Sequence, residues 1–298
     1  MSRILFRGIM PALITPIDEN RQVKKEAVKA LMDYQYSKGV KGFYINGSTG
    51  EGPAIAAATR MEMAETAVAV NAGRGVIINH IASPNFEDAI ALARHADTID
   101  VDAISALAPN FYFNYTPSEI VDYYKALTDA CKKPLLVYAT PSIQGDIVSL
   151  MEKVTSLPGV IGLKFTRMSY YELSLIKQLH LGDINVINGP DEMLLAGLSM
   201  GADGGIGSTY NVMPERFVAL YDAFRQGNMV EAQRIQYAIN RVIKVLLDHG
   251  RGNVVKSVKE ALLLMGYDSG YAASPAAPFT AEEKAALKAD LIAAGLEL

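Results

Sequence analysis

Short apolar runs alternate with amphipathic segments along the whole chain of 298 residues. Several of the runs begin after a glycine or proline turn, and most of them end in small or polar residues. They are too apolar for strands with one face in water, and are typical of a parallel sheet whose outer face is covered. The runs are Ile9–Ile14, Gly42–Asn46, Gly75–Ile81, Ala103–Ala108, Pro134–Ala139, Val160–Thr166, Ile184–Asn188 and Gly204–Ser208.

The segments between the runs carry the signals that begin helices. A serine or threonine followed by glutamate three residues later is the capping-box pattern, in which two side chains bond the free backbone N–H groups of a helix start. Pro117 adds a second signal, because a proline in the first helical position lacks an N–H that would be unpaired there. The pattern begins at Thr59, Thr116, Ser169 and Thr280.

Strand and helix alternate about eight times, which predicts a (β/α)8 TIM barrel. A doubly wound open sheet is the alternative, but the count of runs and the lack of a Gly-x-Gly-x-x-Gly turn after the first run favour the barrel. We expect the barrel over residues 1–226 and a C-terminal helical extension, residues 227–298, packed on it. Helices are expected in that extension at Val230–Leu247, Val254–Met265 and Thr280–Ala294.

Composition and charge narrow the class of protein. The 28 basic and 32 acidic residues give a net charge of -4, so neither nucleic acid nor a membrane is an expected partner. No window of about 18 apolar residues occurs, and Met1–Gly8 lacks the apolar core of a signal peptide. Cys131 is the only cysteine, and the four histidines show no metal-ligand spacing. We expect a cytoplasmic enzyme or binding protein without metal or cofactor.

The run Gly159–Thr166 contains a lysine near its end. Alternation along a strand places Ile161, Leu163 and Phe165 on one face and Lys164 on the other. A buried ammonium costs several kcal/mol unless it is paired or loses its proton. The lysine is therefore either a snorkelling or paired residue at a strand end, or a neutral nucleophile for ketones.

Active sites of barrels lie at the C-terminal ends of the strands. Tyr138 ends the run that precedes the run of Lys164, one strand–helix repeat earlier. If both side chains face the interior, they lie on neighbouring strands roughly 5 Å apart. That geometry suits a lysine that forms a Schiff base and a phenol that carries protons. The alternative for Tyr138 is a half-buried core tyrosine.

Polar residues end three further runs. Ser48 and Thr49 lie in a turn framed by two glycines, which is either an anion nest suited to a carboxylate or an ordinary loop. Asp191 and Glu192 follow a run and open a helix, where they either bond the hydroxyls of a polyol or complement the helix dipole. Ser208 follows a glycine-rich run and belongs either to a tight turn or to a second polar wall.

Together these residues resemble the dihydrodipicolinate synthase/N-acetylneuraminate lyase family. Six motifs agree in order and at plausible spacing along nearly the whole chain, and accident is therefore a poor explanation. The motifs are Pro11–Pro16, Gly47–Glu51, Tyr138, Gly162–Thr166, Gly189–Glu192 and Gly207–Asn211.

The resemblance implies roles for residues in these motifs. Lys164 would form a Schiff base with pyruvate, Tyr138 would handle protons, and Ser48 and Thr49 would hold the carboxylate. It also implies a homotetramer whose ligands are pyruvate and a sugar acid. The positions that match contacts with the sugar part of sialic acid are Thr166, Gly189, Asp191, Glu192 and Ser208.

Within the family, the motifs resemble the branch of class I aldolases that split N-acetylneuraminate into pyruvate and N-acetylmannosamine. The synthase branch carries an arginine shortly after the tyrosine corresponding to Tyr138, where this chain has Ile143. Two positions depart from the usual pattern: Ala139 replaces an asparagine, and Phe111, with Tyr112 beside it, stands at the place of a relay tyrosine. The alternatives are a pyruvate-dependent aldolase or dehydratase for another 2-keto-3-deoxy sugar acid, and a non-catalytic sugar-acid binding protein.

Overall fold

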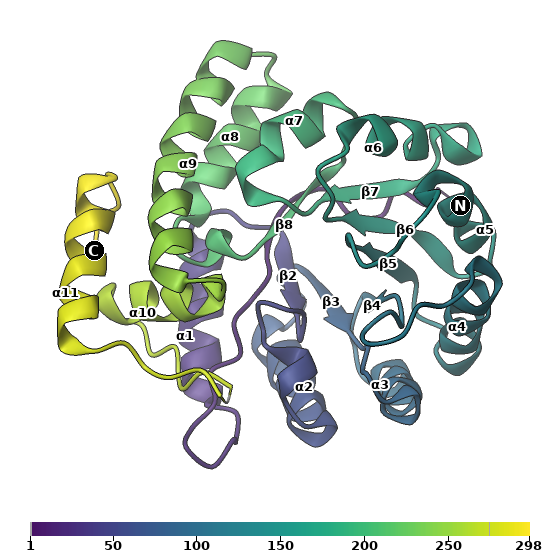
Figure 1. The fold of residues 1–298 in the computed structure, drawn as a ribbon, viewed down its shortest axis with the longest axis horizontal. Helices are drawn as coiled ribbons and strands as arrows, with labels where there is room; N and C mark the ends of the chain where they lie inside the picture. Colours follow the sequence, from purple (N-terminus) through teal and green to yellow (C-terminus); the bar gives the residue numbers. More distant parts are fainter. Residues whose placement is uncertain (1, 274) are drawn as a thin grey trace.

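The structure, a computed structural model, describes residues 2–273 and 275–298. Its eight strands are β1 (Gly8–Pro11), β2 (Gly42–Ile45), β3 (Val76–His80), β4 (Ala103–Leu107), β5 (Leu135–Ala139), β6 (Val160–Phe165), β7 (Asn185–Asn188) and β8 (Gly204–Gly207). They form one parallel sheet in the order β1-β8-β7-β6-β5-β4-β3-β2. A parallel bridge between Ala12 and Tyr44 joins the first strand to the second and closes the sheet. The predicted (β/α)8 TIM barrel is confirmed (Figure 1).

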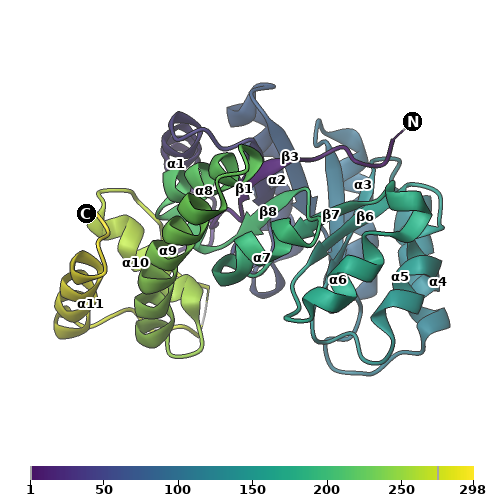
Figure 2. The same ribbon diagram turned by 90° about the horizontal axis from the view of Figure 1, so that it is seen from above.

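Helices follow the strands and surround the barrel (Figures 1 and 2). They are α1 (Lys25–Ser37), α2 (Ala57–Asn71), α3 (Phe86–Thr98), α4 (Pro117–Ala130), α5 (Ile147–Thr155), α6 (Tyr170–Ile176), α7 (Leu194–Ser199), α8 (Pro214–Arg225), α9 (Met229–Gly250), α10 (Val254–Leu264) and α11 (Ala281–Ala293). Short 3-10 helices are η1 (Gly52–Ala54), η2 (Leu179–Gly182), η3 (Asp191–Met193) and η4 (Thr209–Asn211).

Capping boxes begin two of the helices as predicted, α4 at Thr116 and α11 at Thr280. At Ser169 only half of the box forms, because the glutamate three residues later pairs with an arginine instead of the backbone. The prediction at Thr59 was wrong. Helix α2 already begins at Ala57, so this threonine lies inside the first turn and caps nothing.

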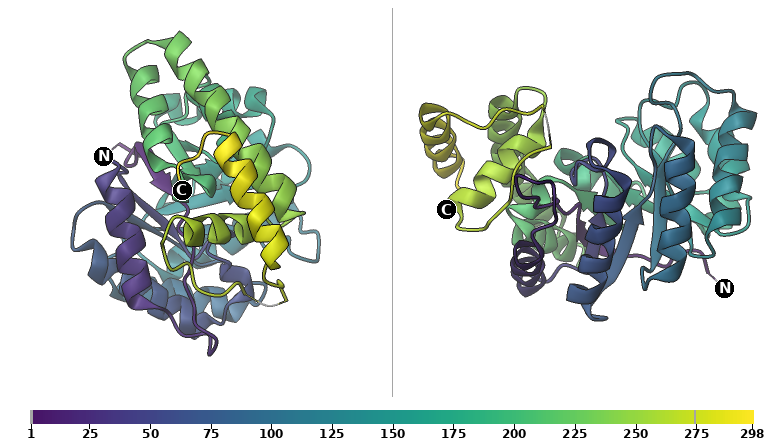
Figure 3. Two further views of the ribbon diagram at one scale, coloured as in Figure 1. Left: turned by 90° about the vertical axis from the view of Figure 1, so that its left-hand side faces the viewer. Right: turned by 90° about the horizontal axis from the view of Figure 1, so that it is seen from below.

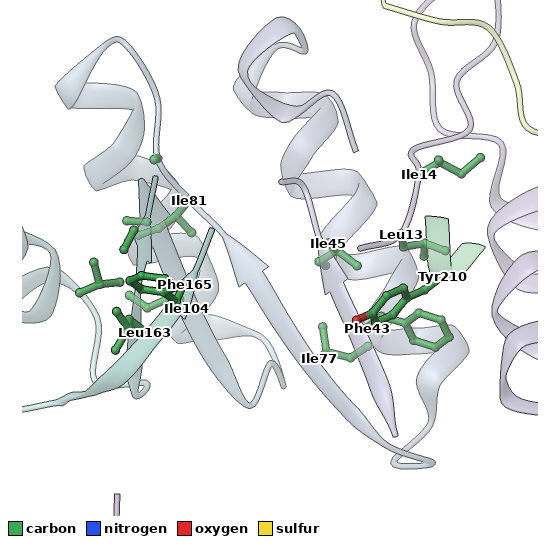
Figure 4. Close-up of a cluster of buried hydrophobic side chains, with 14 of the residues drawn as sticks. Leu13, Ile14, Phe43, Ile45, Ile77, Ile81, Ile104, Leu163, Phe165 and Tyr210 are labelled. Carbon is green, nitrogen blue, oxygen red and sulfur yellow. The ribbon is translucent and has the colours of Figure 1, made fainter. Parts of the chain in front are cut away.

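Two apolar clusters hold the barrel together. The larger cluster lies between the strands and the helices, and Figure 4 shows part of it around Phe43, Ile77 and Leu163. The smaller cluster fills the barrel interior, to which every strand contributes a side chain, as is typical of this fold. Its strand residues are Met10, Tyr44, Ile78, Ala103, Leu136, Ile161, Ile187 and Ile206.

Strand β6 departs from simple alternation near its start. Its register with β5 shifts between Leu135 and Leu136, so that one residue of β6 is extra. Ile161 lies at this irregularity and packs in the inner cluster. The prediction that Ile161 shares a face with Leu163 was therefore wrong, although the alternation holds again beyond the shift.

Helices α9, α10 and α11 make up the C-terminal helical extension. Helix α9 packs against α8, and α10 and α11 pack against α9 (Figure 3). All three begin within one residue of their predicted starts. The division of the chain into units at residue 226 stays a prediction. Between residues 2 and 298, apart from residue 274, no helix has the length and apolar character needed to cross a membrane.

Candidate active site

Lys164 and Tyr138 meet inside the barrel, at the C-terminal ends of β6 and β5. The strand register makes them direct neighbours. Both are buried, with exposed fractions of 5% and 6%. The Nζ atom of the lysine lies 4.3 Å from the centroid of the tyrosine ring. The structure therefore brings together the two residues that strand alternation had paired.

A second aromatic ring flanks the lysine. Lys164 Nζ lies 4.7 Å from the ring centroid of Tyr44, a residue of β2 that sequence reasoning missed. The rings of Tyr44 and Tyr138 pack edge to face, with centroids 6.1 Å apart, and the Tyr44 hydroxyl donates to Ser105 Oγ at 3.0 Å. No described carboxylate pairs with Lys164. The only signal for Tyr44 in the sequence was an aromatic residue at an inward-facing position of a predicted barrel strand.

The environment of Tyr138 favours loss of its proton. Burial raises the pKa of this phenol, but the Lys164 ammonium and the polar side chains of Ser48 and Thr166 outweigh burial and hold the pKa below its usual value. Thr166 Oγ1 is itself buried beside this phenol. The phenol is therefore suited to proton transfer.

His80 forms a neutral part of the same wall. Its Nδ1 lies 3.2 Å from the carbonyl oxygen of Asn46, and its Nε2 accepts the N–H of Leu107 at 3.2 Å. Burial, and then the nearby Arg60, lower the pKa of His80 well below its usual value. Its ring centroid lies 5.9 Å from that of Tyr138. His80 thus stands beside the candidate catalytic pair as an uncharged group.

Ser48 and Thr49 lie in the turn that follows β2. Two residues with left-handed backbone conformation flank this turn, Asn46 with φ of 59° and Glu51 with φ of 54°. The Glu51 N–H donates to the Ser48 carbonyl at 3.0 Å, whereas the N–H groups of Ser48 and Thr49 donate to no acceptor in the described part of the chain. These two N–H groups are available to a carboxylate.

The turn after β7 approaches the ends of β6 and β8 closely. A Cβ atom on Gly189 would lie 1.9 Å from Thr166 Oγ1, so only glycine allows this contact. Asp191 Oδ2 accepts hydrogen bonds from the Thr209 N–H at 2.7 Å, the Thr209 hydroxyl at 2.6 Å and the Ser208 hydroxyl at 3.4 Å. The structure therefore gathers Thr166, Gly189, Asp191 and Ser208 around one edge of the barrel mouth.

Asp191 and Glu192 differ in environment although they are adjacent. Burial raises the pKa of Asp191 to about 6, and the hydrogen bonds from Thr209 only partly offset this effect. Glu192 is half-buried, and its carboxylate forms no ion pair or hydrogen bond with the described residues. Both residues also lie in the first turn of η3, so the dipole interpretation stays open.

The two positions that depart from the family pattern both hold apolar residues. Ala139, at the end of β5, is fully buried in the larger apolar cluster. Phe111 is half-buried and packs against the core, whereas Tyr112 is 86% exposed. Ile143 is buried, and its carbonyl accepts a hydrogen bond from Arg167 at 2.9 Å. An apolar residue thus anchors the loop after β5, where the synthase branch was expected to carry an arginine.

The chain matches the Dihydrodipicolinate synthetase family over residues 5–294. The chain belongs to this family. Among its curated relatives is an N-acetylneuraminate lyase of Rhizobium meliloti, 36% identical over 284 residues, which cover 95% of this chain and 93% of that protein.

Solved structures of similar proteins have the same fold. The Proteus mirabilis N-acetylneuraminate lyase superposes with a TM-score of 0.92 at 28% identity, covering 98% of this chain and 99% of that one. A Ruminococcus gnavus sialic acid aldolase, described as a catalytic lysine mutant, gives 0.91 at 31% identity, covering 97% and 95%. These relatives confirm the predicted class of enzyme, a carbon–carbon lyase.

Proposed function

We propose that the protein cleaves N-acetylneuraminate into pyruvate and N-acetylmannosamine through a Schiff base on Lys164. The observation that carries the proposal is the position of this lysine, buried beside Tyr138 and without a carboxylate partner among the described residues. A lysine that only stabilised the fold at this depth would need an opposite charge. A similar enzyme whose description names a catalytic lysine gives further support.

The chemistry begins with the neutral amine of Lys164, which attacks the C2 ketone of the open-chain sugar acid. Loss of water gives an iminium ion, which withdraws electrons from the neighbouring carbon atoms. The bond between C3 and C4 then breaks as the C4 hydroxyl loses its proton to Tyr138, and N-acetylmannosamine leaves as the aldehyde. Protonation of the enamine at C3 and hydrolysis of the iminium release pyruvate and restore the lysine.

The substrate would lie between two turns. Ser48 and Thr49 present free N–H groups and hydroxyls suited to the carboxylate beside C2. The sugar hydroxyls would extend toward the turn after β7, where Asp191 and Glu192 supply carboxylate oxygens. Thr166, Gly189 and Ser208 complete the site as predicted positions for the sugar part.

We also propose that the protein assembles as a homotetramer. Tyr112 and Phe113, in the loop after β4, are 86% and 72% exposed. Neighbouring exposed aromatic side chains are typical of interaction surfaces. Light scattering of the purified protein at several concentrations gives the mass of the assembly, and a monomer at all concentrations would contradict the proposal.

A product assay tests the proposed activity. Purified protein is incubated with N-acetylneuraminate, and pyruvate and N-acetylmannosamine are both quantified over time. A panel of other 2-keto-3-deoxy sugar acids is assayed in parallel, with dehydration products included. A higher kcat/KM for another member of the panel would move the assignment to the related aldolase or dehydratase. Ligand binding without turnover would favour the non-catalytic binding protein.

A further inference from the structure

A second buried lysine lies outside the reaction centre, on helix α10. Lys259 is 4% exposed, and its Nζ lies 2.5 Å from Glu51 Oε2. It also donates to the carbonyl oxygens of Thr15 at 3.1 Å and Tyr271 at 2.7 Å. Three acceptors match the three N–H groups of an ammonium, so this side chain is held in one position.

Glu51 is the residue that ends the turn of Ser48 and Thr49. Its second carboxylate oxygen accepts the N–H of Ala273 at 2.8 Å. Its φ of 54° is unusual for a residue with a side chain, and such conformations persist only where the surroundings determine them. The Lys259 ion pair and the Ala273 contact therefore hold the carboxylate-binding turn from the side of the C-terminal extension.

Helix α9 holds the other binding turn in a similar way. Gln236 accepts the N–H of Leu195 at 3.0 Å and donates to the backbone carbonyl of Asp191 at 3.3 Å. It also donates to the side chain of Asn240 at 2.8 Å, and Asn240 donates to the backbone carbonyl of Glu192 at 3.1 Å. Two amide side chains of one helix thus bind the backbone of both carboxylate residues.

We propose that the C-terminal helical extension positions the two ends of the substrate site separately. Lys259 positions the turn that binds the carboxylate, and Gln236 with Asn240 positions the turn that binds the sugar hydroxyls. The two contacts lie on different helices and share no residue, so each should act on its own end of the substrate. The inference rests on the proposed function, because it takes these turns as the substrate contacts.

Two variants test the two ends of the substrate site separately. Lys259→Met should raise the pyruvate concentration for half-maximal borohydride trapping by about 10–100-fold, because a shift of about 1 Å in a binding group has effects of this size. Gln236→Leu should leave this concentration within about twofold of wild type and lower kcat/KM for N-acetylneuraminate about tenfold. A residue that only stabilised the fold would alter neither value while the protein stayed folded.

Two further variants test the role of the Lys259–Glu51 ion pair if Lys259→Met does not fold. Glu51→Gln keeps an acceptor for the Ala273 N–H and removes only the charge opposite Lys259, and it should also weaken pyruvate trapping. Lys259→Arg keeps the charge and should recover part of the loss. Circular dichroism and thermal melting establish that each variant is folded at the assay temperature. Unchanged trapping in folded Glu51→Gln, or equal losses of trapping in Lys259→Met and Gln236→Leu, would overturn the proposal.

The same data distinguish this inference from the proposed function. Pyruvate trapping requires no sugar, so the Lys259 effect is measured even if N-acetylneuraminate is not cleaved. Trapping by the wild type without cleavage would refute the substrate assignment, and the panel substrate with the highest kcat/KM then replaces N-acetylneuraminate in the Gln236→Leu assay. Absence of trapping in the wild type would refute both proposals together.

Discussion

Two lysines of this protein are buried to the same extent and have opposite surroundings. Lys164 and Lys259 are 5% and 4% exposed. Lys164 lies against the rings of Tyr44 and Tyr138 and has no described carboxylate partner. Lys259 contacts a carboxylate and two backbone carbonyls. Burial alone therefore does not distinguish these two lysines, whereas their partners do.

The partners determine what each amine can do. Burial holds the pKa of Lys259 below its usual value, and the charge of Glu51 and its hydrogen bond only partly offset this effect. An ammonium whose donors are all occupied has no lone pair for a ketone. Aromatic faces and a phenol stabilise a cation less completely than a carboxylate does, and they leave room for a ligand. The comparison makes five predictions, from the largest expected effect to the smallest.

The first prediction compares the reactivity of the two amines. Pyruvate with borohydride should label Lys164 alone, and mass mapping of the digest locates the label. Lys164→Ala should lose both the label and turnover and remain folded by circular dichroism, because the proposed role of this lysine is covalent. Label on Lys259, or on any other lysine, would contradict the assignment.

The second prediction concerns the phenol that only Lys164 has beside it. Tyr138→Phe keeps the ring at 4.3 Å from the amine and removes the proton carrier. We expect kcat to fall by about 10²–10⁴-fold, the usual contribution of a general acid or base, with a smaller change in KM. Steady-state kinetics on N-acetylneuraminate, with Tyr44→Phe as a matched control for the second ring, measure this. A Tyr138→Phe variant with wild-type kcat would remove the proposed role.

The third prediction concerns stability. Lys259→Met leaves Glu51 buried without its cation and should lose about 3–5 kcal/mol in the free energy of unfolding. Lys164→Met removes a buried amine that has no carboxylate partner and should change it by less than about 1 kcal/mol. Urea unfolding at one fixed protein concentration measures both values. Similar losses in the free energy of unfolding in the two variants would contradict the prediction, because they would mean that both lysines are stabilised by their partners to the same extent.

The fourth prediction tests the sugar end of the site. Asp191→Ala or Glu192→Ala should lower kcat/KM for N-acetylneuraminate by about 10–100-fold, because hydrogen bonds to carboxylates are worth about 1.5–3 kcal/mol. Pyruvate trapping at Lys164 should hardly change, since pyruvate is too short to reach this turn. Glu192→Ala is the cleaner variant, because Asp191 also accepts hydrogen bonds from Thr209. Full cleavage with a small loss of stability, roughly 0.3–1 kcal/mol, would indicate a dipole role only.

The fifth prediction is a pH effect of Asp191. Its pKa of about 6 means that the carboxylate, and its capacity to accept hydrogen bonds, is lost as pH falls through 6. We expect kcat/KM for N-acetylneuraminate to fall by up to about tenfold per pH unit below that value, and Asp191→Asn to lack this step. The free energy of unfolding should change in the opposite direction. A pKa that is raised in the folded state stabilises the fold at low pH, and this contribution is lost as pH rises through 6. Loss of activity together with unfolding would contradict the prediction.

Sequence reasoning succeeded where a local pattern carries the information. The apolar runs predict the strands, because residues buried on both faces of a parallel sheet have no polar alternation. The pairing of Tyr138 with Lys164 follows from the order of repeats and the period of two within a strand. The extension helices begin within one residue of their predicted starts for the same reason, since their spacing and caps are local.

The predictions that failed concern features that a local sequence pattern does not contain. The face of Ile161 depends on a register shift between two strands, which periodicity within one strand does not contain. The cap at Thr59 was wrong because the chain enters α2 two residues earlier, where no side chain caps the helix. Tyr44 was missed because its importance comes from its contact with Lys164, which lies on another strand.

The sequence alone therefore determined the barrel, the order of its elements and the lysine–tyrosine pair, because hydrophobic period and repeat order are properties of neighbouring residues. Only the tertiary structure decided which of the two buried lysines has a carboxylate partner. Glu51 and Lys259 lie far apart in the sequence, and no spacing rule links them. Their contact exists because α10 packs beside the turn after β2. Burying either charge alone would cost several kcal/mol, and the ion pair between them offsets that cost.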